Sequence, residues 1–293
     1  MKKRMFGLLC WMAAAALLLG ACGGSADSEG GPFVILEWSG YETETYWEPF
    51  AAVHPDVAPE YSFFADDAEA LAKAQSGFQF DLVHPCSSWW SLYVEAGLVQ
   101  PIDTSRLSNW DGVYEELAAQ GQFNGEQYFI PWDWGFESIV VRTDLVDEMP
   151  TSWNDLWDPQ YAGHVSLADT AETGFVVAAT ALGIDPYNAS EAEVQQIQDK
   201  LIELRPNLLT LWADYTEINQ LLAQGDVWVA HAWNDAYAAL IDEGYEVEFI
   251  EPEEGRMGWT CCFGILSDSQ NVDLAYDYID ALLDPQSRAN IAN

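Results

Sequence analysis

The sequence predicts an α/β protein that is built as two lobes. Short apolar segments alternate with helical segments along almost the whole chain, which is the pattern of a mostly parallel sheet flanked by helices. The chain has 293 residues, of which 49% are hydrophobic. This is enough to bury one large core or two smaller ones, and we favour two. The third observation is an aromatic stretch at residues 127–142, which indicates a junction between two lobes.

The stretch 127–142 (QYFIPWDWGFESIVVR) is the centre of this prediction. It begins apolar, is interrupted at Pro131 and continues as a β-branched run at 139–141, which predicts a strand, a bend and a second strand. Turns are usually small and polar, whereas this one carries Trp132, Trp134 and Phe136. Such a bend indicates a packed junction between two bodies or the wall of a cleft. A turn sandwiched inside one core is the alternative.

The N-terminal half provides the first group of alternating elements. Strands are expected at 33–38, 61–64 and 80–83, and helices at 44–53, 66–75 and 89–96. Ser87 or Ser88 is expected to cap the helix at 89–96. In sheets of this kind ligands bind beyond the carboxyl ends of the strands. The loops that hold Trp38, Cys86 and Ser88 follow such ends.

The C-terminal half repeats the alternation. A turn and helix start is expected at 150–156, strands at 165–167, 209–212, 227–232, 247–250 and 258–266, and helices at 175–182, 191–204, 218–224 and 237–242, with a last helix at 275–283. No internal repeat is present.

The N-terminus predicts export. Three basic residues at positions 2–4 precede an apolar run and the sequence Leu-Gly-Ala-Cys, which resembles a bacterial lipoprotein signal at 1–21 with Cys22 as the lipidated residue. A plain signal peptide or a single-pass anchor is the alternative. Residues 22–31 are expected to form a flexible tether. The protein is therefore expected in the periplasm or on the outer cell surface, as a membrane-anchored lipoprotein.

The formal charge of −38 excludes one class of partner and favours another. Nucleic acid is excluded because a phosphate backbone requires a positive surface. The field of the protein enriches cations near it instead. Solubility or salt adaptation is the alternative reason for the charge, so that only carboxylates inside a cleft would be specific for a ligand.

An ordered set of motifs resembles a known family. The set is Trp38-Ser-Gly-Tyr41, Asp81-Leu-Val-His-Pro85, Ile130-Pro-Trp-Asp-Trp-Gly135, Trp233-Asn-Asp235, Glu254-Gly255, Trp259 and Leu282-Leu-Asp-Pro285. Over nearly all of the mature chain this order resembles the spermidine/putrescine-binding proteins of ABC importers. The resemblance implies a two-lobed periplasmic-binding-protein fold of type II, with hinge crossover strands and a ligand between the lobes.

The resemblance also implies the division of the chain. Residues 32–131 are expected to form lobe 1 and residues 132–257 lobe 2, and residues 258–293 are expected to return to lobe 1. Members of the family run on for several more elements, so we expect the C-terminal part of lobe 2 to be missing.

The resemblance gives ten candidate ligand-binding positions. Eight match cleft residues of the family, namely Trp38, Tyr41, Cys86 and Ser88 in the first lobe and Asp169, Glu172, Trp233 and Trp259. The other two are Cys261, at a position where the family has a ligand-binding residue, and Asp235, which directly follows the Trp233-Asn pair. A polyamine combines an alkyl chain with ammonium groups, so its site needs aromatic faces and carboxylates. The implied partners are a small cation and an ABC permease, with no cofactor and no metal, and the protein is expected to be a monomer.

Cys261 departs from the family pattern, which has an aspartate at that position. Asp235, Asp133 or Glu137 would have to compensate for the missing carboxylate. With this fold, Cys86 and Cys261 are expected in adjacent loops of an oxidising compartment, and a disulfide between them is predicted. Cys262 points to the opposite face of its strand. A neutral disulfide wall argues for a ligand that is smaller and singly cationic, or otherwise altered.

Several alternatives remain open. Trp38, Trp233 and Trp259 would serve equally as core indoles, and Asp169 with Glu172 would serve as a helix capping box. The four histidines show no metal-ligand spacing. A secreted glycoside hydrolase would also be rich in Trp and carboxylates, but no hydrolase motif is present and Asp169 and Glu172 would lie on one helical face. A quaternary ammonium ligand, held in an aromatic cage, is the alternative within the same fold.

Overall fold

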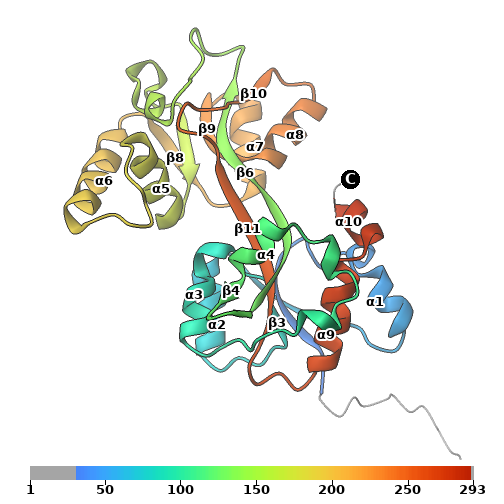
Figure 1. Ribbon diagram of the computed structural model, residues 1–293. Coiled ribbons are helices and arrows are strands. Elements are labelled where there is room, and N and C mark those ends of the chain that lie inside the picture. Colours follow the sequence, from blue (N-terminus) through green and yellow to red (C-terminus); the bar gives the residue numbers. More distant parts are fainter. Residues whose placement is uncertain (1–30, 292–293) are drawn as a thin grey trace, which may run out of the picture.

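The computed structural model describes residues 31–291 (Figure 1). The predicted signal at 1–21, Cys22 and the tether, apart from Gly31, lie outside the described residues. Within the described range, no helix combines the length and the apolar character needed to cross a membrane.

The chain forms two lobes that are connected by two long strands (Figure 1). The first lobe contains β1 (Val34–Trp38), β2 (Glu60–Phe64), β3 (Leu82–Val83), the hairpin β4 (Gln122–Phe123) and β5 (Glu126–Gln127), and the helices α1 (Glu48–Val53), α2 (Asp67–Gln75), α3 (Trp90–Glu95), α4 (Glu115–Gln120), α9 (Val272–Leu282) and α10 (Pro285–Ile291). The second lobe contains β7 (Val165–Ala168), β8 (Leu208–Trp212), β9 (Val229–Trp233), β10 (Val247–Phe249), α5 (Ala171–Ala181), α6 (Glu191–Leu204), α7 (Tyr215–Gln224) and α8 (Asn234–Asp242). The connecting strands are β6 (Phe129–Arg142) and β11 (Met257–Ile265).

Short 3-10 helices join many of these elements. They are η1 (Glu44–Tyr46), η2 (Ser87–Trp89), η3 (Thr104–Arg106), η4 (Trp110–Gly112), η5 (Trp153–Trp157) and η6 (Pro159–Tyr161).

A single nine-stranded sheet runs through both lobes in the order β2-β1-β3-β11-β6-β9-β7-β8, with β10 also paired to β6. The strands β1, β2 and β3 are parallel in the first lobe, and β7, β8 and β9 are parallel in the second. The long strands β6 and β11 are antiparallel to each other and to the strand that each meets in a lobe. The sheet is therefore mixed, and the prediction of a mostly parallel sheet holds only within each lobe.

Helices cover both faces of the sheet in each lobe. In the first lobe, Ile35 belongs to the apolar cluster that includes residues of α1 and α9, and its neighbour Leu36 belongs to the cluster that includes residues of α2 and α3. In the second lobe, Ile139 and Val140 divide in the same way between two clusters. Consecutive strand residues point to opposite faces, so each of these apolar pairs contributes to two cores. Each fully buried side chain of this size contributes about 1.5–3 kcal/mol.

The predicted bend at Pro131 is wrong, because β6 continues through it as one strand of 14 residues. Opposite it in β11, Cys262 pairs with Pro131 and Cys261 with Asp133, so that Trp132 is the extra residue of a β-bulge. Proline has no N–H to donate to the ladder and is tolerated at such irregularities. The aromatic stretch is thus a continuous hinge strand and not a turn within one core.

Three further predictions differ from the structure. The helix expected at 44–53 is divided at Trp47 into η1 and α1, whose first turn includes Pro49. Neither Ser87 nor Ser88 caps α3, because η2 intervenes and α3 begins at Trp90 without a side-chain cap. The helix expected to be the last one is followed by α10.

Candidate ligand-binding site

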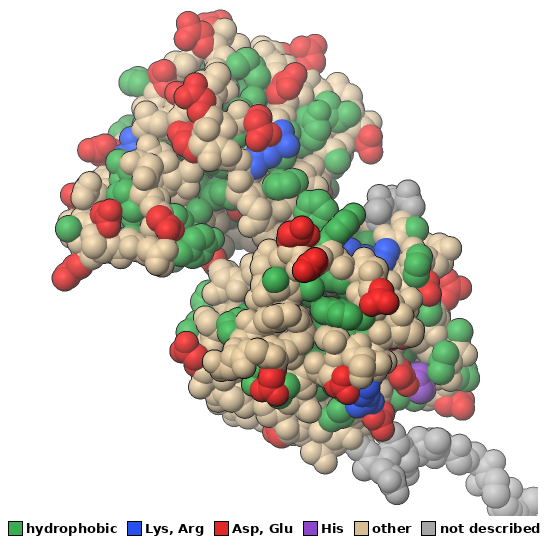
Figure 2. Space-filling model, viewed as in Figure 1, with side chains coloured by type: hydrophobic (Ala, Val, Ile, Leu, Met, Phe, Trp, Pro, Cys, Tyr) green, Lys and Arg blue, Asp and Glu red, His purple; other side chains and the backbone are tan. Residues whose placement is uncertain are grey.

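One face of the hinge strands gathers several of the side chains singled out from the sequence. Residues that lie directly opposite each other in neighbouring strands point to the same face. Asp133 pairs with Cys261, Gly135 with Trp259, and Glu137 with Trp233. These residues therefore share one face of β6 where the strand passes from one lobe to the other. Figure 2 shows the surface hollowed between the two lobes beside this crossing.

Gly135 makes room for the Trp259 indole. A Cβ atom at this position would lie 2.6 Å from the Trp259 ring and 2.8 Å from the side-chain oxygen of Asn234. That oxygen also accepts a hydrogen bond from the backbone N–H of Phe136 at 3.2 Å. The glycine is needed for this close approach, which explains its place between Trp134 and Phe136 in the hinge sequence.

Glu137 is fully occupied by neighbours in the second lobe. Its two carboxylate oxygens meet Trp233 Nε1 at 2.9 Å and His231 Nε2 at 2.7 Å. Burial raises the pKa of Glu137, but the charge of His231 and the hydrogen bonds from His231 and Trp233 outweigh it and hold the pKa below its usual value. Glu137 therefore orients the Trp233 indole, and it is a poor substitute for the carboxylate that Cys261 lacks.

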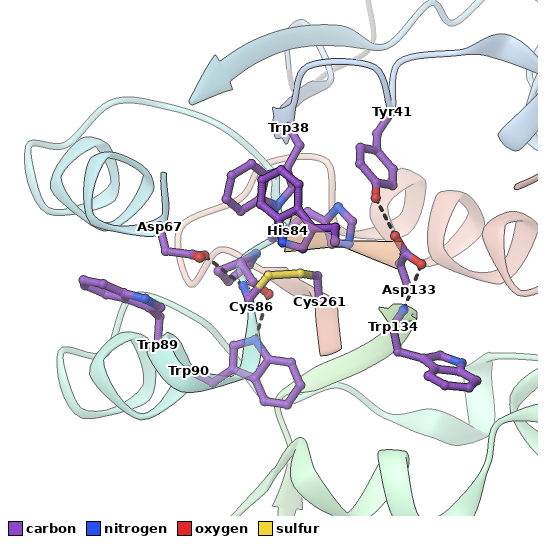
Figure 3. Close-up of a disulfide and its surroundings, with 12 residues drawn as sticks. Trp38, Tyr41, Asp67, His84, Cys86, Trp89, Trp90, Asp133, Trp134 and Cys261 are labelled. Atoms are coloured by element: carbon purple, nitrogen blue, oxygen red, sulfur yellow. Dashed lines mark hydrogen bonds between the residues drawn. A yellow bond between two sulfur atoms is a disulfide. The ribbon is translucent and has the colours of Figure 1, made fainter. Parts of the chain in front are cut away.

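Tyr41 and Asp133 meet on the first-lobe side of the hinge. The Tyr41 hydroxyl donates a hydrogen bond to the Asp133 carboxylate (Figure 3). Burial, together with the negative charges of Asp133, Glu37 and Asp235, raises the pKa of Tyr41 well above its usual value. Tyr41 thus stays neutral and donates to a carboxylate that comes from the hinge.

Asp235 belongs to the same group of charges. It lies in the first turn of α8, where its Oδ1 atom accepts the backbone N–H of Ala236 at 2.9 Å. Burial raises the pKa of Asp235, and the negative charge of Asp133 contributes to the rise. Carboxylates from the hinge and from the second lobe are therefore within electrostatic reach of each other. A ligand with several separated positive charges would require such an arrangement.

Trp38 is held at the end of β1 by hydrogen bonds to the buried residues Glu37 and His84. Its Nε1 atom donates to the backbone oxygen of His84 at 2.9 Å, and its backbone N–H donates to Glu37 Oε1 at 2.7 Å. His84 Nδ1 meets the same Glu37 oxygen at 2.7 Å, and burial raises the pKa of Glu37 above its usual value. The Trp38 ring packs 4.4 Å from the ring of Phe64. Trp38, Trp233 and Trp259 are all half-buried, so none is a fully enclosed core indole.

A disulfide joins Cys86 to Cys261, and it is the pairing predicted from the sequence (Figure 3). It ties η2 to the hinge strand β11, with the two Cα atoms 3.9 Å apart. Cys262 is a free, buried thiol. The Cys86 backbone N–H donates to Asp67 Oδ1 at 2.8 Å, and burial raises the pKa of Asp67 to about 7. Sequence reasoning missed Asp67 because it looks like an ordinary carboxylate in the first turn of a helix.

The predicted pair Asp169 and Glu172 is not a capping box. Thr170 is the N-cap of α5, where its hydroxyl accepts the backbone N–H of Thr173 at 3.0 Å. Asp169 is exposed just before the helix, at the carboxyl end of β7. Glu172 is also exposed, and its Oε2 atom accepts a hydrogen bond from Trp89 Nε1 at 3.1 Å. This bond connects the two lobes, and Trp89 had no functional role in the sequence-based site.

Two features lie outside this group. Ser88 is exposed on η2, and no hydrogen bond connects its side chain to the other predicted residues among the described contacts. Two cavities of about 260 and 470 Å³ lie in the first lobe away from the hinge face, and they contain none of the ten predicted positions. Among residues 31–291, no three His, Cys, Asp or Glu side chains are grouped so as to hold a metal ion.

Two α/β lobes, a pair of hinge strands and indoles with carboxylates at the crossing define a two-lobed solute-binding protein of type II. Residues 48–293 match the family of bacterial extracellular solute-binding proteins, and the chain belongs to this family. The resemblance inferred from the ordered motifs is confirmed at this level. The family consists of solute-binding proteins and not of enzymes, so the hydrolase alternative is discarded.

The alignments of this chain with similar proteins extend over most of its length. The spermidine/putrescine-binding periplasmic protein of Escherichia coli (strain K12) is 27% identical over 284 residues, which make up 96% of this chain and 80% of that protein. The putrescine-binding periplasmic protein PotF of the same strain is 28% identical, covering 100% of this chain and 82% of that protein. The solved structure of a putative spermidine/putrescine ABC transporter from Listeria monocytogenes has a TM-score of 0.79 at 25% identity, covering 88% of this chain and 80% of that one.

Proposed function

We propose that this chain captures a polyamine-like cation, such as putrescine or spermidine, between its two lobes and delivers it to the permease of an ABC importer. The observation that carries the proposal is the hydrogen bond between Tyr41 and Asp133 on the strand face that also carries the partners of Trp233 and Trp259. The charge of Asp235 acts on the same group. Carboxylates bind ammonium groups, and aromatic faces accept both the ammonium groups and the alkyl chain between them. The similar proteins described above are named for ligands of this kind.

The proposed ligand set extends to both lobes. Its members are Trp38, Tyr41, Asp133, Asp169, Glu172, Trp233, Asp235 and Trp259, with the Cys86–Cys261 disulfide as a neutral wall and Ser88 at the margin. The half-buried state of the three indoles and the exposure of Asp169 and Glu172 support this set, because each side chain keeps a surface free for a ligand. Lobe boundaries near residues 131 and 257 are part of the same proposal.

A quaternary ammonium ligand is the second candidate. It is favoured by the disulfide at the position of the missing carboxylate and by the engagement of both Glu137 oxygens. An aromatic cage with few free carboxylates suits a cation that has no N–H to donate.

We also propose that the chain works as a monomer that is attached to the membrane through a lipid on Cys22. The basic residues, the apolar run and the Leu-Gly-Ala-Cys sequence support the anchor. The tether at 22–31 would let the lobes reach a permease.

Calorimetry on the purified protein tests the ligand class. Putrescine and spermidine are expected to bind, choline to bind more weakly, and short sugars not to bind. Asp235→Asn is expected to weaken diamine binding on the order of 30-fold or more, since it removes one partner of a desolvated charge pair. Asp242→Asn, at the exposed end of the same helix, is the matched control and should have no effect.

The same titrations contain the results that would contradict the proposal. Binding and turnover of a sugar, with no response to any amine, would refute capture of a cation. Asp169→Asn should weaken a diamine far more than choline, and equal losses would remove Asp169 from the ligand set.

A further inference from the structure

The starting point is a side-chain hydrogen bond that crosses from one lobe to the other. Trp89 Nε1 donates to Glu172 Oε2 at 3.1 Å. Trp89 ends η2 in the first lobe, and Glu172 lies in the first turn of α5 in the second. Since the two residues are held by different lobes, the bond depends on how the lobes are placed relative to each other.

The position of Trp89 is fixed on the first-lobe side. Its own backbone N–H donates to Cys86 O at 3.1 Å, and Cys86 is tied to β11 by the disulfide. The next residue, Trp90, is buried and donates its indole N–H to Pro85 O at 2.9 Å. The Trp89 indole is therefore presented by a braced turn, so the ordering of its side chain costs little when the lobes meet.

Besides Trp89, Glu172 has a neighbour that carries the same negative charge, Asp67. Asp67 lies in the first turn of α2, close to η2 through its hydrogen bond with the Cys86 N–H. The pKa of Asp67 is raised mainly by burial and further by the negative charge of Glu172. Two carboxylates from opposite lobes are thus within electrostatic reach of each other, and one of them accepts the Trp89 indole N–H. Their repulsion is relieved when a cation lies between them.

We propose that Trp89 is a positioning residue that orients the Glu172 carboxylate for the ammonium group of the ligand. The proposal rests on the function proposed above. The bond from Trp89 occupies Oε2 and leaves Oε1 of Glu172, together with Asp67 from the other lobe, for the ligand. Oxygen atoms arranged in this way accept N–H donors, which primary and secondary ammonium groups supply and quaternary ammonium groups lack. The arrangement therefore selects protonated amines over quaternary cations.

The decisive variant is Trp89→Phe, which keeps an aromatic ring and removes the N–H. Putrescine affinity measured by calorimetry is expected to fall about tenfold, as for the loss of one hydrogen bond to a charged group, while choline affinity changes less than about twofold. Trp228→Phe is the matched control, because the Trp228 indole N–H donates to Gly225 O within the second lobe. It should leave both affinities unchanged. Equal losses for both ligands, or no loss for putrescine, would overturn the proposal.

A double-variant cycle separates positioning from a merely structural role. If Trp89 acts through Glu172, Trp89→Phe combined with Glu172→Ala should bind putrescine no more weakly than Glu172→Ala alone. Losses that multiply would show that Trp89 acts independently and would refute the proposal.

A ligand-free measurement distinguishes this proposal from the proposed function. Small-angle scattering should give a larger radius of gyration for Trp89→Phe than for the wild type and the Trp228→Phe control, because a bond between the lobes is lost. Equal radii would refute the contact even if amines bind. If the wild-type protein binds no amine, the proposed function fails, and the assignment of Glu172 to an ammonium group fails with it, whatever the scattering shows.

Discussion

Breaking the Cys86–Cys261 disulfide should cost the protein a large part of its stability. The two cysteines are separated by 175 residues, so the bond closes a long loop that includes β6, the whole second lobe and the first half of β11. Loop-closure entropy for that length corresponds to about 5 kcal/mol, and bridges commonly contribute 2–4 kcal/mol. We expect the Cys86→Ser, Cys261→Ser double variant to lose about 3–5 kcal/mol in the free energy of unfolding.

Urea unfolding with and without a reducing agent provides the assay and its internal control. Reduction should destabilise the wild type by the same amount as the double substitution, and it should leave the double variant unchanged. Mass spectrometry of the oxidised protein should find Cys262 as the free thiol of the described chain. Free thiols at Cys86 and Cys261, or an unfolding free energy that does not respond to reduction, would refute the reasoning.

Two other substitutions have opposite expected effects on stability. The pKa of Asp67 is raised to about 7 from an ordinary 3.8, so between these values the folded state keeps a proton that the unfolded chain has lost, and stability falls as pH rises through this window. Asp67→Asn should therefore be more stable than the wild type by about 2–4 kcal/mol at pH 8 and nearly equal to it at pH 4 in urea unfolding; a difference independent of pH would contradict the assigned cause. Gly135→Ala should cost about 1–3 kcal/mol and displace Trp259, as read from unfolding and indole fluorescence, because the new methyl group meets that ring at 2.6 Å. Gly258→Ala, whose Cβ meets nothing closer than 3.9 Å, should be nearly neutral, and equal effects of the two would show that crowding by Trp259 is not the reason.

The sequence was informative wherever a local pattern coincides with the final packing. The β-branched run that includes Ile139 and Val140 predicted a strand, and the structure places these two side chains in two different cores. The bend predicted at Pro131 was wrong because the effect of this proline depends on the residue opposite it in β11. That residue, Cys262, is 131 positions away and cannot be identified from the local sequence. The strands within each lobe were placed well because their pattern is local, whereas the continuity of β6 through Pro131 depends on its pairing with β11.

The candidate site shows the same division between local and tertiary information. Indoles and carboxylates at Trp233, Asp235 and Glu172 were identified through the order of motifs. The engagement of Glu137 by His231 and Trp233, and the contact of Trp89 with Glu172, arise from side chains of different elements. No spacing along the chain marks such contacts, because they depend on how strands and lobes are placed relative to one another.

The two strands that join the lobes have a consequence for how the ligand affinity of the protein can evolve. Among the described residues, only β6 and β11 continue the sheet from one lobe to the other, and β6 contains the bulge at Trp132. The apparent dissociation constant equals the intrinsic one divided by the fraction of molecules in the competent arrangement. A substitution that changes the preferred twist of this two-stranded ribbon would change that fraction. Natural selection can therefore adjust the concentration at which the protein scavenges its cargo through residues that never touch it.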